Sequence, residues 1–233
     1  MIVKNAWFRF NGIDSRTFGI RVTAMPATTR AERRVEKITV DGRSGTLHAD
    51  EEAFNSYDKT MECAIIDREK VDEIAAWLNG SGDMVFSTEP DKVYRVLIAN
   101  KIDINGMMQT FQRFQVIMEC QPFKKSVNAF GDRINLTEGT SIYNKGTWKS
   151  QPKITIYGSG NITLKINSVA YGLKEVSGSI TIDSEMMEVY KGSDNENSKY
   201  TAAEFPFFAV GRNDISWSGN VQRVEIEPNW RWI

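Results

Sequence analysis

The sequence has only one histidine among its 233 residues, which limits the chemistry that it can carry. A catalytic triad or a cysteine–histidine pair needs an imidazole, so such a site would have to use His48. Three carboxylates follow at positions 50 to 52, but the spacing matches none of the zinc patterns. We expect a solvated loop around His48, and no catalytic residue, metal site or cofactor.

Cysteine is also scarce, with only Cys63 and Cys120 in the chain. Both lie in apolar, strand-like runs, residues 61–66 and 114–120, where a thiol usually behaves as a small buried hydrophobe. This placement favours buried free thiols over a disulfide or a reactive thiol.

Long hydrophobic runs and an excess of one charge are absent as well. No segment approaches the roughly 20 apolar residues of a membrane span, and the first residues lack the apolar core of a signal peptide. The 29 basic and 30 acidic residues nearly cancel, so no global field attracts nucleic acid or an anionic membrane. We expect a protein made in a cytoplasm, without membrane insertion.

What is present is a foldable composition, with 41% hydrophobic and 25% charged residues. The length allows one large β domain or two ordinary ones, and we favour two. Near Phe130 the pattern changes, because downstream the helical period disappears and short β runs alternate with Gly, Asn and Ser turns. We predict a β-rich α+β domain over residues 1–130 and a sandwich or jelly roll over residues 131–233.

The first domain is predicted to hold one helix, residues 67–79, with an apolar stripe of Val71, Ile74, Ala75 and Leu78 and with Gly80 as its C-terminal cap. Two hairpins are expected, one turning at Asn11–Gly12 between residues 7–10 and 18–22, the other at Asn105–Gly106. The remaining expected strands are residues 59–66, 84–86, 94–99 and 107–120.

The second domain is predicted to contain short strands that end in an aromatic terminus. The expected strands are residues 154–157, 162–166, 179–182, 188–190, 207–210 and 221–226, with turns at residues 211–214 and 218–220. Trp230 and Trp232 would be costly to leave in water, so we expect them to pack against the body or a partner.

The first domain also contains a segment with special geometry, residues 41–47, which includes Gly42 and Gly45. It resembles a phosphate loop only superficially, because the Walker lysine and the following helix are missing. Its glycines allow a sharp turn that presents Arg43 to a neighbouring subunit, or else the loop is purely intrachain.

Two rival functions can be drawn from the second domain. Exposed aromatic side chains could stack on sugars, and Trp148, Tyr157, Tyr171 and Tyr190 are the candidates for a carbohydrate-binding module. Carboxylates at residues 183, 185, 194 and 196 could serve a glycosidase, but sequence spacing does not fix the separation that this chemistry needs.

Four motifs in order along the chain carry a family resemblance. They are Phe8–Gly12 with Phe18–Ile20, Val40–Leu47, Pro122–Phe123, and Gly211–Gly219 followed by Pro228–Arg231. Together they resemble the distal tail proteins of siphophages and related prophages. Each motif alone is weak, but the set spans the chain and agrees with the two-part layout.

The resemblance implies an N-terminal domain of β structure plus one helix that forms a six-membered ring, followed by a galectin-like β-sandwich. Such a homo-hexamer joins the tail tube protein to the tail-associated hub protein at the distal end of the virion's tail. It encloses the end of the tape-measure protein, offers its periphery to receptor-binding proteins and leaves a channel through which DNA passes without specific binding. We expect a non-enzymatic structural protein; the alternative is a carbohydrate-binding sandwich for host adhesion.

The motifs of this resemblance also supply the candidate interface residues, Arg43, Leu47, Trp230 and Arg231. Two departures from the family pattern stand out. Asn229 occupies a position where a basic residue is expected, and the second domain, at about a hundred residues, leaves no room for an inserted carbohydrate-binding module.

Overall fold

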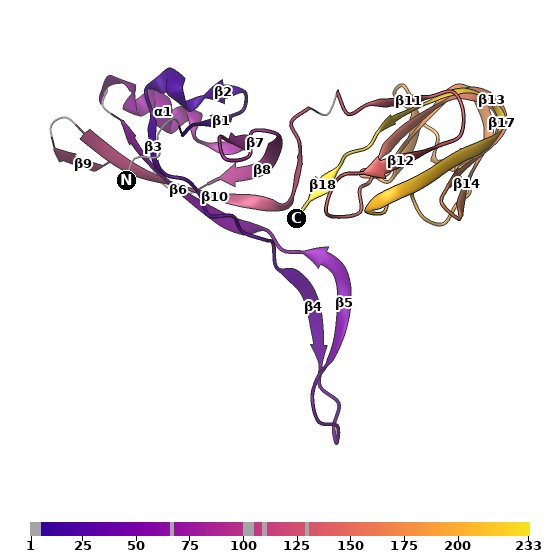
Figure 1. The fold of residues 1–233 in the computed structure, drawn as a ribbon, viewed down its shortest axis with the longest axis horizontal. Coiled ribbons are helices and arrows are strands. Elements are labelled where there is room, and N and C mark those ends of the chain that lie inside the picture. Colours follow the sequence, from indigo (N-terminus) through magenta and orange to yellow (C-terminus); the bar gives the residue numbers. More distant parts are fainter. Residues whose placement is uncertain (1–5, 66–67, 100–104, 109–110, 129–130) are drawn as a thin grey trace. The chain divides into compact units, whose positions relative to one another are not determined.

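The computed structural model describes residues 6–65, 68–99, 105–108, 111–128 and 131–233. Its fold is mainly β with one α-helix among the described residues, as the sequence predicts (Figure 1). The chain forms two compact units, Met1–Val127 with Ile233, and Asn128–Trp232. The ring-forming and galectin-like roles that the resemblance gives to residues 1–130 and 131–233 stay predictions.

The first unit is built on an antiparallel sheet. Its strand order is β2 (Ile13–Asp14), β1 (Phe8–Phe10), β7 (Gly80–Phe86), β8 (Lys92–Ile98), β10 (Phe111–Ser126), β6 (Tyr57–Ile65) and β3 (Arg21–Ala24), and β9 (Asn105–Met108) also pairs with β10. Alternate residues of these strands enter the core, as in Phe8 and Phe10 or Met61 and Cys63, all 0% exposed. Both cysteines are buried and free, which confirms the prediction from their surroundings.

The helix is shorter than the predicted range of 67–79. A 3-10 turn, η2 (Arg68–Lys70), leads into α1 (Val71–Trp77), and Gly80 starts β7 with φ +81° instead of capping the helix. Ile74 is buried, whereas Ala75 of the predicted stripe is exposed. Trp77 fixes the helix to the sheet, because its ring stacks on Phe8 at 5.6 Å between centroids. Among the described residues, no helix combines the length and the apolar character needed to span a membrane.

Two predicted hairpins differ from the observed ones. Asn11 (φ +48°) and Gly12 (φ +82°) do form the tight turn, but it joins β1 to β2. The 3-10 turn η1 (Ser15–Phe18) then intervenes, so β3 pairs with β6 instead. Asn105 and Gly106 lie within β9, opposite residues 113 and 112 of β10, and not at a turn.

A separate two-stranded sheet, β4 (Arg33–Ile38) and β5 (Leu47–Phe54), interrupts the first unit between β3 and β6. The predicted solvated loop around His48 is therefore a strand, although its residues are exposed. The strand β5 was not predicted from the sequence, because apolar and polar residues do not alternate along it.

The second unit is one antiparallel sheet with very long strands. The order is β11 (Ile134–Leu136), β17 (Gly211–Glu227), β13 (Lys153–Ile166), β14 (Val169–Asp183), β15 (Glu188–Lys191) and β16 (Asp194–Asn195), while β12 (Thr140–Asn144) pairs with the first half of β17. Register shifts between residues 157 and 163 of β13 separate the halves of the long strands. A short 3-10 turn, η3 (Asn197–Lys199), follows β16.

Several predicted strands and turns merge in this unit. Residues 154–157 and 162–166 are parts of β13, and the predicted turns at 211–214 and 218–220 lie inside β17. The predicted strand 207–210 is reduced to a single bridge between Phe208 and Ser150. The full length of β17 was not predicted, because polar residues such as Asn213 are typical of turns. In the structure Asn213 is fully buried and makes four hydrogen bonds.

The aromatic terminus packs on its own unit, as expected. Trp230 is buried and its ring lies 5.9 Å from that of Phe208. Trp232, in the short β18 (Arg231–Trp232), is partly buried against the same core. Asn229 adopts φ +48°, and its Nδ2 donates to the carbonyl of Gln151 at 3.0 Å.

Candidate assembly interface

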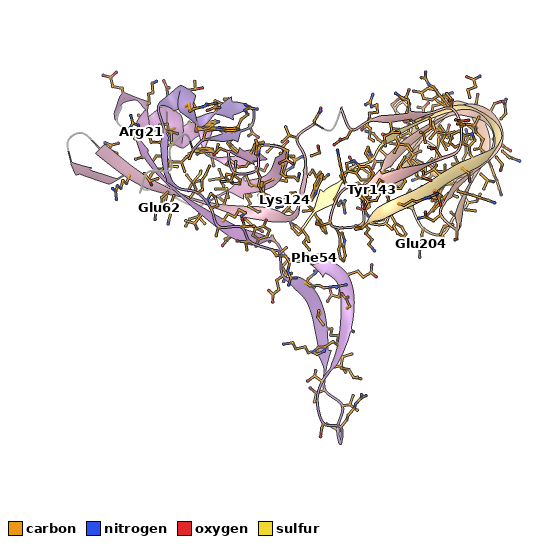
Figure 2. The ribbon with its side chains drawn as sticks, viewed as in Figure 1. Arg21, Phe54, Glu62, Lys124, Tyr143 and Glu204 are labelled. Carbon is orange, nitrogen blue, oxygen red and sulfur yellow. The ribbon has the colours of Figure 1, made fainter. Side chains whose placement is uncertain are left out.

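The β4–β5 hairpin lacks a core of its own. All six residues of β4 and the first six residues of β5 are exposed. Figure 2 shows side chains projecting from both strands, with Phe54 at the end where the hairpin joins the sheet. A lone two-stranded hairpin is marginal in water at best. Among the described residues, the hairpin is therefore the element whose stability would gain most from contact with another molecule.

Charge is divided between the two strands of the hairpin. β4 carries Arg33, Arg34 and Lys37 with one glutamate, whereas β5 carries three consecutive carboxylates at positions 50–52. Arg33 Nε donates to Asp50 Oδ1 at 2.8 Å, and Arg34 Nε lies 3.4 Å from Glu51 Oε2. Exposed pairs of this kind contribute little to stability, so their effect is to fix which residues face each other.

Asp50 is the best-defined carboxylate of the hairpin. Its Oδ1 accepts a hydrogen bond from the Glu52 backbone N–H at 2.9 Å. This bond and then the Arg33 guanidinium lower the pKa of Asp50, because both stabilise the ionised form. The Asp50 carboxylate therefore stays ionised to a lower pH than an ordinary aspartate.

The tip of the hairpin presents Arg43. Gly42 (φ +75°) and Gly45 (φ +87°) occupy left-handed conformations, and Arg43 N–H donates to the Val40 carbonyl at 3.1 Å. The special geometry predicted for residues 41–47 is thus confirmed. Arg43 is exposed, and just below the tip Leu47 pairs with Ile38, at 39% and 40% exposure. The tip combines a cation with two adjacent aliphatic side chains.

The base of the hairpin is anchored. The rings of Phe54 and Phe123 meet edge to face at 5.5 Å, and Asn55 N–H donates to the Glu32 carbonyl at 2.9 Å. Lys59 is only 4% exposed, and its ammonium donates a hydrogen bond to the Ala27 carbonyl on the segment that leads into β4. Burial lowers the pKa of Lys59. The base of the hairpin is thus fixed, whereas its tip is exposed.

The other two candidate interface residues lie in the second unit. Trp230 is 4% exposed and the Arg231 side chain 12%. Arg231 Nη2 donates to Gln151 Oε1 at 2.6 Å and lies 3.5 Å from Glu185 Oε1, and burial lowers the pKa of Arg231. These contacts are internal to the unit; an interface role for Trp230 and Arg231 stays a prediction.

The aromatic residues of the rival carbohydrate-binding function are buried or partly buried. Tyr171 is 2% exposed, and the Tyr157 ring is covered by the Arg223 guanidinium at 4.0 Å. Trp148 and Tyr190 are half-buried. Within the described ranges, no three His, Cys, Asp or Glu side chains are grouped as a metal ion would require.

Sequence reasoning missed the apolar side chains of β4, Val35 and Ile38, which are 37% and 40% exposed. One signal could have found the hairpin. A basic segment, residues 30–37, is followed within twenty residues by the acidic segment 50–52, with a glycine-containing turn between them. Opposite charges facing each other across a turn are typical of paired strands.

Comparison with known proteins adds two findings. Residues 14–120 match the family model of the phage tail protein RIFT-related domain. The crystal structure of the Dit protein of phage SPP1, described as a paradigm of hub adsorption apparatus in phages that infect Gram-positive bacteria, covers 96% of this chain and 98% of its own with a TM-score of 0.77. Sequence identity is 11%, so this likeness shows the fold alone. No curated protein matches the sequence.

Proposed function

We propose that this chain, in which residues 14–120 match the phage tail protein RIFT-related domain and whose fold is similar to that of the SPP1 Dit protein, is the ring-shaped adaptor at the distal end of a long non-contractile siphophage tail. The domain match and the fold together support a structural role in a phage tail. A non-enzymatic role is in keeping with both. The ring, its position and its partners are the proposal.

In this proposal six copies form a closed ring. The ring joins the tail tube protein to the tail-associated hub protein, encloses the end of the tape-measure protein, and offers its periphery to receptor-binding proteins. DNA passes through the central channel, and the net charge of −1 suits a conduit that must not grip its cargo. The chain is thus a component of the virion.

The observation that carries the proposal is the exposed β4–β5 hairpin. A head-to-tail contact repeated around an axis closes into a ring when its rotation is right. Such a contact lets each hairpin lie on the next subunit, so all hairpins become covered without any special end subunit. The basic β4 and acidic β5 also give each hairpin edges of opposite charge, which suits head-to-tail contact.

Within that contact we assign Arg43 and Leu47 to the subunit interface. Arginine is enriched at interfaces because its planar guanidinium offers several donors in fixed geometry. Leu47 with Ile38 supplies the apolar surface beside it. The side chains of Trp230 and Arg231 make contacts within the second unit. Only the family resemblance assigns these two residues to a contact with a partner.

The proposal is tested by electron microscopy of the purified chain, with mass in solution measured on the same sample. We expect six-fold rings with a central channel, and we expect Arg43→Glu to abolish them while the chain stays folded. Lys174→Glu makes the same charge change at an exposed position of β14 and should leave the rings intact. Rings unchanged by Arg43→Glu would remove Arg43 from the interface. A chain that stays monomeric even with purified tube and hub proteins would refute the adaptor.

The alternative, a carbohydrate-binding sandwich, has less support. Of its four aromatic candidates, Tyr171 is buried, and one face of the Tyr157 ring is covered by Arg223. Glycan binding by the full chain that disappears in Tyr190→Ala would favour this alternative.

A further inference from the structure

Lys59 occupies a core-facing position of β6. Alternate residues of this strand enter the core, and the next two in the same row, Met61 and Cys63, are 0% exposed. Lys59 is itself only 4% exposed, whereas Asp58 and Thr60 on either side of it are exposed. A lysine is almost never buried to this extent unless it is paired. A hydrophobic residue is therefore the ordinary choice at this position, and the lysine calls for a specific reason.

The Lys59 ammonium is held by a carbonyl and by aromatic rings. Its Nζ donates to the Ala27 carbonyl. The same atom lies 5.7 Å from the ring centroid of Tyr57 and 5.4 Å from that of Tyr94. Ring faces attract a cation only weakly, so the Ala27 carbonyl is the directional partner of this charge.

A second buried lysine nearby shows the usual arrangement. Lys124 Nζ lies 2.8 Å from Glu89 Oε1, and the two side chains are 11% and 30% exposed. Among the described residues, Lys59 makes no ion pair of this kind. Burial lowers the pKa of Lys59, because the charged form loses its hydration. An apolar side chain of similar length would avoid this cost, so stability alone does not explain the lysine.

The carbonyl that Lys59 binds lies on the entry segment of the hairpin, residues 25–32, which joins β3 to β4 without a helix or strand. Ala27 is exposed, so water could bind its carbonyl in the absence of the lysine. Near the other end of the entry segment, Ala31 is only 1% exposed. Lys59 thus adds a second fixed point, and two fixed points set the direction in which the segment runs into β4.

We propose that Lys59 is a positioning residue for assembly: its ammonium holds the entry segment and so fixes the direction in which the β4–β5 hairpin leaves the sheet. A hydrogen bond prefers a defined geometry, whereas an apolar contact does not. A head-to-tail contact closes into a ring only when its rotation is right, so a hairpin without a fixed direction closes the ring less often. The inference rests on the proposed ring and adds to it the residue that orients the hairpin.

Förster transfer in single molecules measures the direction of the hairpin, at picomolar concentration to keep the chain monomeric. One dye is attached at the tip through Ser44→Cys and the other on β6 through Glu62→Cys, since both positions are exposed (Glu62 is labelled in Figure 2). The thiols of Cys63 and Cys120 are 0% exposed and stay unlabelled. We expect one narrow distribution of donor lifetimes in the unsubstituted chain. After Lys59→Met we expect a distribution about twice as broad, at an unchanged melting temperature.

Lys124→Met is the matched control, because it makes the same exchange at the other buried lysine. It leaves the Glu89 carboxylate without its ammonium, so we expect a lower melting temperature. Among the described residues, Lys124 donates to Glu89 and not to the entry segment, so the lifetime distribution should stay narrow. Lys59→Arg keeps a cationic donor and should keep it narrow as well. These opposite effects separate positioning from stability.

Electron microscopy of the same variants, at matched concentration and without dyes, tests the consequence for the ring. We expect Lys59→Met to form at least about tenfold fewer rings than the unsubstituted chain. Lys124→Met should form rings normally at temperatures well below its melting temperature. A normal ring yield for Lys59→Met would overturn the inference even if its lifetime distribution were broad.

Two further outcomes would overturn the inference and leave the adaptor role standing. One is an equal lifetime distribution in the unsubstituted chain and in Lys59→Met. The other is a fall in melting temperature for Lys59→Met as large as that for Lys124→Met, because Lys59 would then serve the stability of the fold. An unsubstituted chain that forms no rings, even with purified tube and hub proteins, would refute the adaptor and the assembly role of Lys59 together.

Discussion

The β4–β5 hairpin and the β13–β14 hairpin are both antiparallel ladders, but they differ in what lies beneath them. In β13 alternate residues such as Ile154 and Ile156 are 0% exposed, whereas all of β4 is exposed. Burying one such aliphatic side chain contributes about 1.5–3 kcal/mol. The β13–β14 hairpin therefore packs on a hydrophobic core of its own unit, whereas the β4–β5 hairpin has no such core among the described residues.

The largest effect is expected in the core of the second unit. Ile156→Ala leaves a cavity between β13 and its neighbours and should lower the free energy of unfolding by about 2–5 kcal/mol. Urea unfolding followed by tryptophan fluorescence measures it. Leu47→Ala on the hairpin is the control. An effect of equal size for Leu47→Ala in the isolated chain would break the comparison, because it would mean that the hairpin has a core of its own.

A somewhat smaller loss is expected from the buried amide that fixes the start of β17. Asn213 Nδ2 donates to the carbonyls of Ala209 (2.9 Å) and Gly211 (3.0 Å), and its Oδ1 accepts from Ala209 N–H at 2.9 Å. Asn213→Ala leaves these groups without a partner, which should cost about 1–3 kcal/mol. Thermal unfolding measures the change. A neutral result would indicate that water replaces the amide.

A partly buried ion pair of the first unit, outside both hairpins, should make stability depend on acid. Lys124 Nζ lies 2.8 Å from Glu89 Oε1, with side-chain exposures of 11% and 30%. Burial alone would raise the pKa of Glu89, but hydrogen bonds from Lys124 and Tyr94 lower it overall. Ionised Glu89 therefore stabilises the fold above pH 4.5, the ordinary pKa of glutamate, and this contribution disappears as the pH falls through the lowered pKa.

Glu89→Gln should accordingly reduce stability at pH 7 and flatten its decline below pH 4.5. Circular dichroism melting curves between pH 7 and pH 3 test this expectation. An unchanged slope would mean that Glu89 is not responsible.

The smallest effect is expected on the hairpin itself. Arg33→Ala removes the pair with Asp50, in which both side chains are more than 40% exposed, and should leave the melting temperature of the isolated chain unchanged. The same variant should disturb assembly if the register of β4 and β5 matters at the interface. A clear loss of thermal stability in the isolated chain would show that the hairpin is stable without a partner.

The same two hairpins differ in how well the sequence predicted them. The core of β13 could be predicted, because Ile154, Ile156, Ile162 and Leu164 alternate with polar residues. The strands β4 and β5 could not, because both of their faces are exposed and their pattern is set by charge. β17 was missed in part because Asn213 and Gly219 are typical turn residues. In the structure, however, Asn213 makes buried hydrogen bonds and Gly219 adopts φ +104° within the continuous strand.

For the candidate interface, the sequence identified the tip of the hairpin but not its extent. Gly42 and Gly45 signalled the turn that presents Arg43, since left-handed geometry depends on local sequence. The internal packing of Trp230 and Arg231 depends on residues far away in the sequence, Phe208 and Gln151, so no local pattern could reveal it.

Hydrogen exchange of the backbone amides tests the central claim most directly, in the isolated chain and in the assembled ring or tail. We predict that amides of β4 and β5 exchange rapidly in the isolated chain and become protected on assembly, while those of β13 and β14 are protected equally in both. Amides of β4 and β5 that exchange at the same rate in both states would contradict the claim that this hairpin forms the subunit interface.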